Sequence, residues 1–232
     1  MAYGIWQSSE GLQFGILAER GARESQSCEG GSVADKKHFQ ESYEAGNTPW
    51  EIDMPDSNLI ETVTRTPIKP CKALEIGCGT GDNAIWLTQQ GFDVVAIDSS
   101  ETAIEKAKNK ASSAGAPCAF LICDVLAGHI EGAPFGFAFD RGCFHTLDTA
   151  EERRRFAEIV NRHLEEGRLW LSLVGSADER RDGPGPPQRS AGDIVNAVEP
   201  CFEILSLVSG HFGGNRANPP RAWVCLMRKR GS

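Results

Sequence analysis

The stretch that decides the fold is L-E-I-G-C-G-T-G, from Leu74 to Gly81, in which a short apolar strand runs directly into three alternating glycines. The residues from Asn83 to Gln90 then have the pattern of a helix, so a strand–turn–helix junction is expected here. Glycines allow the backbone to turn tightly and a ligand to approach the main chain closely. Because open α/β sheets bind ligands at the carboxyl ends of their strands, the junction predicts a ligand site.

On both sides of this junction, apolar strands alternate with amphipathic helices, a pattern typical of a parallel sheet covered on both faces. The last two strands have no helix between them and must pair antiparallel at one edge. We therefore expect an α/β fold, a Rossmann-like three-layer sandwich with a mostly parallel seven-stranded sheet and an antiparallel last strand pair. The predicted strands are 73–76, 93–97, 119–123, 135–140, 168–174, 203–209 and 222–227, and the helices between them are 83–90, 101–114, 150–166 and 190–198.

Two of these helices carry clear start signals. Thr149 with Glu152 matches a capping box, and Ser190 with Asp193 is expected to cap the following helix. Gly167 is expected to end the helix 150–166.

The chain before residue 67 differs in character. Residues 21–35 are rich in Gly, Ser and Glu, a composition typical of a mobile segment or of a lid that orders on binding. Short helices are predicted over 36–45, with Phe39 and Tyr43 on one face, and over 57–64. We expect an N-terminal extension and helical lid over the active site (1–66), followed by the main domain (67–232).

An acidic residue stands at the end of each of the first four predicted strands, namely Glu75, Asp98, Asp124 and Asp140. Since the carboxyl ends of parallel strands meet at one edge of a sheet, all four are expected to face one crevice. Asp98 occupies the position from which an acid reaches ribose hydroxyls in this architecture. Each acid alone could simply cap a loop or helix, but the four together with the glycine turn favour a ligand site.

A dinucleotide-binding enzyme is the first alternative, but its fingerprint is G-x-G-x-x-G, whereas the spacing here is G-x-G-x-G. Asp82 follows the third glycine and would repel a pyrophosphate at that point. Residues 71–175 resemble instead the class I S-adenosylmethionine-dependent methyltransferase domain. The resemblance implies S-adenosyl-L-methionine as cofactor and S-adenosyl-L-homocysteine as its product.

The resemblance also implies roles for individual residues. The turn from Glu75 to Gly81 would hold the methionine part of the cofactor, Asp98 the ribose hydroxyls and Asp124 the adenine amino group, with Val125 beside the ring. The expected cofactor-binding residues are Trp50, Glu75, Gly77, Cys78, Gly79, Thr80, Gly81, Asn83, Asp98, Ser99, Asp124, Val125 and Asp140.

The segment G-N-T-P-W-E (46–51), followed by Met54 and Pro55, resembles the entry segment of the thiopurine, thiol and halide methyltransferase group and of related tellurite-resistance methyltransferases. In that group the segment lies over the bound cofactor and its Trp helps to close the pocket, a role that passes to Trp50. The family often has Gly where this chain has Asp53, so the match is partial. Ordinary packing of Trp50 against an N-terminal helix is the alternative.

The segment F-D-R-G-C-F-H-T-L (139–147) resembles the stretch after strand four of small-molecule methyltransferases, where the transferable methyl group should point. Asp140, Arg141 and His145 are therefore the candidate catalytic residues, with His145 as a base that deprotonates a thiol or hydroxyl. A hydrogen bond that caps the next loop is the alternative role of His145. Cys143 is interpreted as an inert neighbour in preference to a metalloid ligand.

Composition restricts the partners and the compartment. The net charge of −8 over 232 residues repels phosphate backbones, so no nucleic-acid partner is expected. No apolar run reaches the roughly 18 residues of a membrane span, and the N-terminus lacks a signal-peptide pattern. The 8 cysteines form no C-x-x-C pair and no zinc-finger spacing, which is typical of reduced thiols in a cytoplasmic protein. We expect a cytoplasmic monomer or weak homodimer without a metal.

The predicted activity is methyl transfer to a small molecule, with a thiol or similar soft nucleophile as the first choice of acceptor. Such an acceptor needs no strong base, only a small apolar pocket, which we expect Trp50, Phe144 and the loop 183–187 to roof, with His211 and Phe212 in reach. An O- or N-methyltransferase of a small metabolite is one alternative. A non-catalytic protein that binds S-adenosylmethionine is another.

Overall fold

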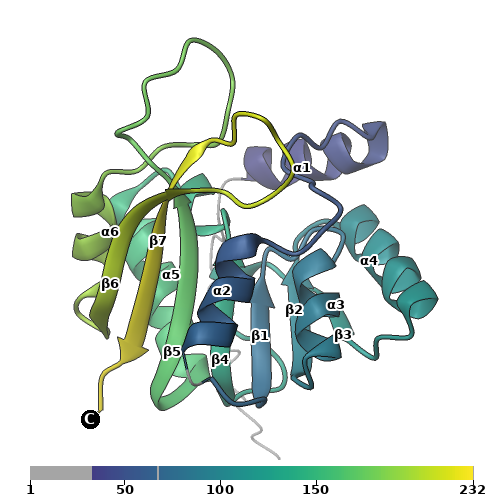
Figure 1. Cartoon of the computed structure of the whole chain (residues 1–232), viewed down its shortest axis with the longest axis horizontal. Helices are drawn as coiled ribbons and strands as arrows, with labels where there is room; N and C mark the ends of the chain where they lie inside the picture. The colour runs from purple at the N-terminus through teal and green to yellow at the C-terminus, as the bar shows by residue number, and fades with distance from the viewer. Residues whose placement is uncertain (1–32, 67, 232) are drawn as a thin grey trace, which may run out of the picture.

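A computed structural model describes residues 33–66 and 68–231, which form one seven-stranded sheet in the order β3-β2-β1-β4-β5-β7-β6 (Figure 1). Strands β1 to β5 run parallel, and β7 lies antiparallel between β5 and β6. The predicted mostly parallel sheet with an antiparallel last pair is thus confirmed. The strands are β1 (Lys72–Ile76), β2 (Asp93–Asp98), β3 (Ala119–Ile122), β4 (Phe135–Arg141), β5 (Leu164–Gly175), β6 (Phe202–His211) and β7 (Arg221–Lys229).

Helices cover both faces of the sheet and give the three expected layers (Figure 1). Helices α2, α3 and α4 bury apolar side chains against one face, and α5, α6 and η1 do so against the other. Among the described residues no helix combines the length and apolar character needed to cross a membrane. The helices are α1 (Val33–Ala45), α2 (Ser57–Arg65), α3 (Asp82–Gln89), α4 (Glu101–Ala114), α5 (Ala150–His163) and α6 (Ala191–Val198), with 3-10 helices η1 (Val125–Ala127) and η2 (Phe144–Thr146).

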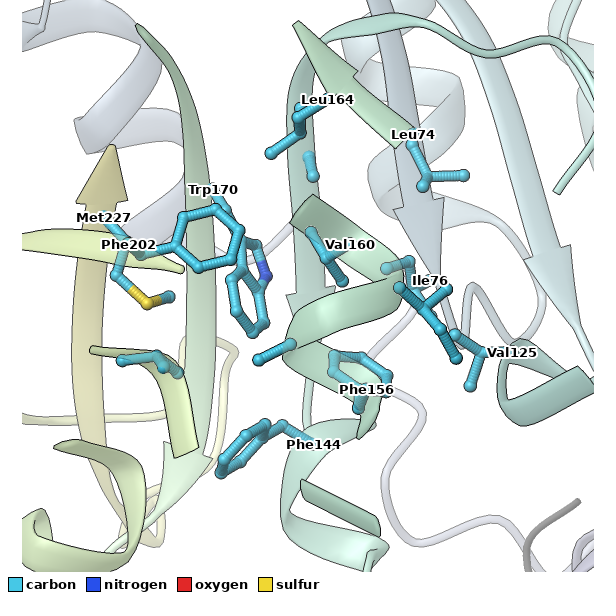
Figure 2. Packing of buried hydrophobic residues seen from close by; sticks show 14 of the residues in the cluster. Leu74, Ile76, Val125, Phe144, Phe156, Val160, Leu164, Trp170, Phe202 and Met227 are labelled. Carbon is cyan, nitrogen blue, oxygen red and sulfur yellow. The ribbon is translucent and has the colours of Figure 1, made fainter. Parts of the chain in front are cut away.

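Side chains alternate along each strand, so neighbouring residues serve opposite faces of the sheet. On the α5 face, Trp170 is fully buried beside Phe156, with ring centroids 5.7 Å apart, and beside Phe202 at 5.2 Å. Figure 2 shows this cluster, in which Leu74 and Ile76 of β1 also take part. The opposite face of β1 carries Ala73 and, by the same alternation, Glu75.

The expected capping boxes are present, with Thr149 and Glu152 at the start of α5 and Ser190 and Asp193 at the start of α6. The predicted end of α5 is wrong. The helix stops at His163, and β5 begins immediately at Leu164, which pairs with β4. Gly167 has a φ of 70° inside β5, where the register with β4 shifts, and therefore does not end the helix.

The N-terminal helices lie in two different places. Helix α1 packs near α4, beyond the carboxyl ends of β1 and β2 (Figure 1). Leu59 of α2 is 0% exposed within the buried cluster formed with α3 and α4. Helix α2, which the predicted lid (1–66) included, therefore belongs to the outer layer of the sandwich. The predicted features of residues 1–32 lie outside the described residues.

Candidate active site

The glycine turn lies directly beneath the chain that connects α1 to α2. Gly79 has a φ of 53°, in the left-handed region that favours glycine. A Cβ atom at this position would lie 2.6 Å from Oε1 of Glu51 and 2.7 Å from the hydroxyl of Tyr43. We call residues 33–56 the covering segment, because their side chains lie over the turn and occupy the space that a side chain at Gly79 would need.

Aromatic side chains of the covering segment gather beside the turn. Nε1 of Trp50 donates to the hydroxyl of Tyr43 at 2.9 Å, and that hydroxyl donates to Oε1 of Glu51 at 3.2 Å. The Trp50 ring also meets Phe39 edge-on, with centroids 5.4 Å apart. Trp50 thus packs on α1, as in the alternative considered for it, and its role in closing the pocket stays a prediction. Tyr43 and Glu51 were not among the predicted site residues, although Tyr43 stood out on one helix face.

The N-terminal end of α4 holds the covering segment in place. Oε1 of Gln40 accepts from the hydroxyl of Ser100 at 2.8 Å, and Nε2 of Gln40 donates to the hydroxyl of Thr102 at 2.8 Å. Nζ of Lys106 donates to the main-chain oxygen of Tyr43 at 2.6 Å. These contacts fix α1 over the carboxyl ends of the strands.

The backbone conformation of Asp53 shows why the resembled family often has a glycine at this position. Its φ is 53°, the conformation for which glycine is the least strained residue and which Asp tolerates better than most others. The carboxylates of Glu51, Asp53 and Asp82 lie close enough to hold a metal ion. Lys110, however, places Nζ 2.9 Å from Asp82 and 3.5 Å from Asp53, and so neutralises part of this charge.

Two acids form the floor of the turn. Oδ2 of Asp98 accepts from the main-chain nitrogen of Gly79 at 2.9 Å, and burial raises the pKa of Asp98. Glu75 is 1% exposed, and burial raises its pKa to about 8. Oε1 of Glu75 accepts from Nδ2 of Asn83 at 3.0 Å, whereas its buried Oε2 has no partner among the described residues.

Asp140 does not share the crevice with these two acids. It is aligned with Ile76 of β1 and therefore points to the α5 face, while Glu75 is aligned with Phe139 and points to the other. Nε1 of Trp170 donates to Oδ2 of Asp140 at 3.0 Å, and the Phe144 nitrogen donates to Oδ1 at 3.1 Å. The expectation that all four strand-end acids face one crevice is wrong for Asp140. Burial raises the pKa of Asp140 to about 6, although the hydrogen bonds that its carboxylate accepts act in the opposite direction.

Arg141 bridges three segments of the chain. Its Nε donates to the buried Oδ2 of Asp56 at 2.8 Å, NH1 to the main-chain oxygen of Trp50 at 3.0 Å, and NH2 to that of Gly213 at 3.2 Å. Its guanidinium also stacks over the Phe212 ring, 5.1 Å from the centroid. Arg141 thus joins the covering segment to the connection between β6 and β7.

His145 is buried with one ring nitrogen already committed. Its Nδ1 accepts from the main-chain nitrogen of Gly175 at 2.9 Å, so the neutral ring carries its proton on Nε2. Burial lowers the pKa of His145 to about 3, and the positive charges of Arg189, Arg141 and Arg181 lower it further. This hydrogen bond agrees with the alternative role, a His that fixes a neighbouring loop, and the base role of His145 stays a prediction.

Two glycines of the turn serve packing. A Cβ at Gly77 would lie 3.0 Å from the Cβ of Cys143, so this glycine lets the ends of β1 and β4 approach each other. A Cβ at Gly81 would lie 2.9 Å from the Phe120 ring. Only Gly79 faces the covering segment.

The remaining predicted cofactor residues surround the same edge of the sheet. The hydroxyl of Thr80 donates to Oε2 of Glu51, and Cys78 is buried beneath the turn. Ser99 is exposed after β2. Asp124 follows β3 and accepts from the nitrogen of Leu126, and Val125 is buried in η1. The described structure therefore gathers these residues at the carboxyl ends of β1, β2 and β3.

The predicted roof of the acceptor pocket needs correction at Phe144. This side chain is 1% exposed and packs against Phe156 and Trp170 on the α5 face, so it cannot line a pocket above the turn. Phe212 lies edge-on to His145, with centroids 5.8 Å apart. The loop 183–187 is largely exposed.

Comparisons with known proteins agree with this geometry. Residues 73–167 match the family model of the methyltransferase domain. A protein named "Probable thiol methyltransferase 2" from Arabidopsis thaliana is 28% identical over 173 residues, which cover 73% of this chain and 75% of that protein.

Two solved structures share the fold. One, reported for the conversion of a disulfide bond into a thioacetal group during echinomycin biosynthesis, has a TM-score of 0.72 and 23% identity, covering 84% of this chain and 91% of the other. The other is the Burkholderia thailandensis 1,6-didemethyltoxoflavin-N1-methyltransferase with bound 1,6-didemethyltoxoflavin and S-adenosylhomocysteine, with a TM-score of 0.66, 18% identity and coverages of 84% and 87%. Residues 73–167 thus carry a methyltransferase domain, and with the glycine turn, its floor acids and the sheet order these matches support a class I S-adenosylmethionine-dependent methyltransferase.

Proposed function

We propose that this enzyme methylates a small-molecule acceptor, and that the acceptor is a thiol or a similar soft nucleophile. Bound S-adenosylmethionine supplies an electrophilic methyl group on a sulfonium sulfur. The protein's own task is to hold the acceptor in line with that group and to exclude water.

The residues around the glycine turn suit this cofactor. The main chain at Gly79 carries no side chain and is covered by Glu51 and Tyr43, so a ligand that displaces these two side chains can approach it closely. The unpartnered Oε2 of Glu75 offers an acceptor for an ammonium group, and Asp98 offers carboxylate oxygens at the end of β2. Asp124 and Val125 stand at the end of β3, where the family resemblance expects the adenine. We assign the covering segment as the lid, with Trp50, Tyr43 and Glu51 over the turn.

The observation that carries the choice of acceptor is that none of the three predicted catalytic side chains offers a free basic atom. Asp140 is 0% exposed on the α5 face and accepts there from Trp170 and from a main-chain nitrogen, so it cannot reach an acceptor above the turn. Arg141 is a permanent cation, and Nδ1 of His145 is occupied. A hydroxyl acceptor would need a general base at this point. A thiol, with a pKa near 8.5, ionises sufficiently by itself at neutral pH. The Arabidopsis relative's name supports the same acceptor class.

Oxygen or nitrogen acceptors form the second candidate, since the same fold occurs in the 1,6-didemethyltoxoflavin-N1-methyltransferase. We further propose a cytoplasmic monomer or weak homodimer with no nucleic-acid partner, on the basis of the net charge of −8 and of the free thiols of the described cysteines.

The test is a panel of small thiols, hydroxyl compounds and amines, in which methylated product and S-adenosylhomocysteine are both quantified. We expect turnover with thiols, at a rate that rises with pH as the thiol ionises, and the same pH profile in a His145→Gln variant. Preferential turnover of hydroxyl compounds or amines would overturn the acceptor assignment. Cofactor binding without turnover of any acceptor would favour the non-catalytic alternative.

A further inference from the structure

We propose that Asn83 is a positioning residue, which orients Glu75 toward the amino group of the cofactor and links that orientation to the covering segment through Asp56. The inference rests on the cofactor site of the proposed function but is independent of the acceptor. It changes the role expected for Asn83, which the family resemblance made a direct cofactor contact.

Both ends of the Asn83 side chain are used inside the protein. Asn83 is 8% exposed at the start of α3. Its Nδ2 donates to Oε1 of Glu75 at 3.0 Å, and its Oδ1 accepts from the main-chain nitrogen of Asp56 at 2.8 Å. Because each end of the Asn83 amide already has a partner within the protein, we infer that Asn83 acts through these two partners.

The position requires a donor and an acceptor at a fixed spacing, which an asparagine supplies. An aspartate would place a further carboxylate against Glu75, and an alanine would leave the Glu75 oxygen and the Asp56 nitrogen without partners in a buried place. The donor side is the one that matters for the ligand, because a hydrogen bond to the ionised form of Glu75 favours that form.

Glu75 has one oxygen held and one oxygen free. Oε1 is bound to Asn83, and the Ala84 main chain also lies near the carboxylate. The buried Oε2 makes no hydrogen bond within the described residues and can accept from a cationic donor. The charged groups that act on Glu75 are Asp82 on α3 and Asp98 on β2, both acidic. A bound ammonium group would therefore bring a positive charge directly to Glu75 and favour its ionised form.

The other side of Asn83 leads to the covering segment. The Asp56 carboxylate is 0% exposed and accepts through Oδ2 from Nε of Arg141 at 2.8 Å. NH1 of Arg141 donates in turn to the main-chain oxygen of Trp50 at 3.0 Å. One continuous series of hydrogen bonds thus runs from the floor of the turn to the residue that covers it.

Titration calorimetry with S-adenosylmethionine from pH 6 to 9 tests this, without any acceptor. We expect Asn83→Ala to bind about 10- to 100-fold more weakly than the wild type at pH 7, as for loss of a hydrogen bond to a charged group. The pH at which affinity reaches half its maximum should also move upward, because Glu75 loses the donor that favours its ionised form. The Glu75→Gln variant has no carboxyl group at this position. Its remaining pH dependence of binding therefore gives the contribution of the cofactor's own amino group, which titrates in the same range.

Asn58→Ala is the matched control. Asn58 also bonds the Asp56 carboxylate, with Nδ2 2.8 Å from Oδ1, but has no contact with Glu75. It should leave the pH midpoint of binding unchanged. An equal midpoint shift in Asn58→Ala would show that any disturbance of Asp56 has this effect, and would overturn the proposal.

The double variant Glu75→Gln with Asn83→Ala completes the test. If Asn83 acts through Glu75, the double variant binds the cofactor about as well as Glu75→Gln alone. Losses that add fully would overturn the proposal. Should Asn83→Ala fail to fold, Asn83→Asp gives the same comparison, with a larger upward shift of the midpoint expected from the added carboxylate. Normal wild-type binding with unaffected variants would refute the role of Asn83 alone, whereas absent wild-type binding would refute the cofactor site itself.

Discussion

Replacing Arg141 by alanine separates a scaffold role from a catalytic one. The change removes hydrogen bonds of 2.8, 3.0 and 3.2 Å to Asp56, Trp50 and Gly213, and it leaves the 0% exposed Asp56 carboxylate without its cation. Breaking one side of a buried ion pair costs about 3–5 kcal/mol. In a protein of this size each kcal/mol lowers Tm by about 2–4 °C, so a fall of roughly 6 to 20 °C is expected.

Thermal unfolding followed by circular dichroism measures this, with Arg228→Ala as control. Arg228 pairs with Glu203 at 3.3 Å between half-exposed side chains, and its loss should cost at most about 1 kcal/mol. Arg141→Lys should recover only part of the stability, because lysine lacks the planar fork of donors. If Arg141→Ala unfolds at the wild-type temperature and yet loses kcat/KM, the guanidinium acts on the reactants and our placement of it in the scaffold is wrong.

Three further changes have defined outcomes. Gly79→Ala should weaken S-adenosylmethionine binding at least about tenfold in calorimetry, because its Cβ meets Glu51 and Tyr43; unchanged affinity would mean that the cofactor does not approach this glycine. Asp53→Gly should stabilise the protein by about 0.5–1 kcal/mol by relieving its φ of 53°, and a lower Tm would assign the Asp53 side chain a structural role. The unfolded chain protonates His145 near pH 6.5 but the native protein only near pH 3. Because the unfolded state then binds more protons, stability is lost as the pH falls through this window. The wild type should lose about 1.6 kcal/mol more than His145→Gln between pH 6.5 and 5. Equal losses in urea unfolding would show that native His145 also protonates there.

The glycine turn and its neighbouring acid Asp98 were predictable because they are local in sequence. The strand, the alternating glycines and the helix from Lys72 to Gln89 follow one another, so each residue's place follows from its neighbours. Asp98 ends the adjacent strand and needs only a parallel pairing to reach the Gly79 nitrogen. No contact between segments far apart in the chain is needed to place these residues.

Asp140 was misplaced for a physical reason. Strands covered on both faces are apolar throughout, so their sequences carry no alternation that tells one face from the other. Only the register, in which Asp140 is aligned with Ile76 and Glu75 with Phe139, shows that the two acids point in opposite directions. The end of α5 was missed similarly, since the pairing of Leu164 with Phe135 is a long-range contact.

The residues after β4, where we expect the methyl acceptor to bind, depend on such long-range contacts throughout. The roles of Arg141 and His145 could therefore not be predicted from the sequence. Arg141 and His145 bind the covering segment, the β6–β7 connection and the end of β5 to one another. On the proposed function, side chains used in this way fix the shape of the site and supply no general base. Catalysis would then come from alignment and exclusion of water, which can supply a large part of a barrier's reduction. We therefore expect the rate to follow the ionisation of the acceptor rather than that of any residue of the site.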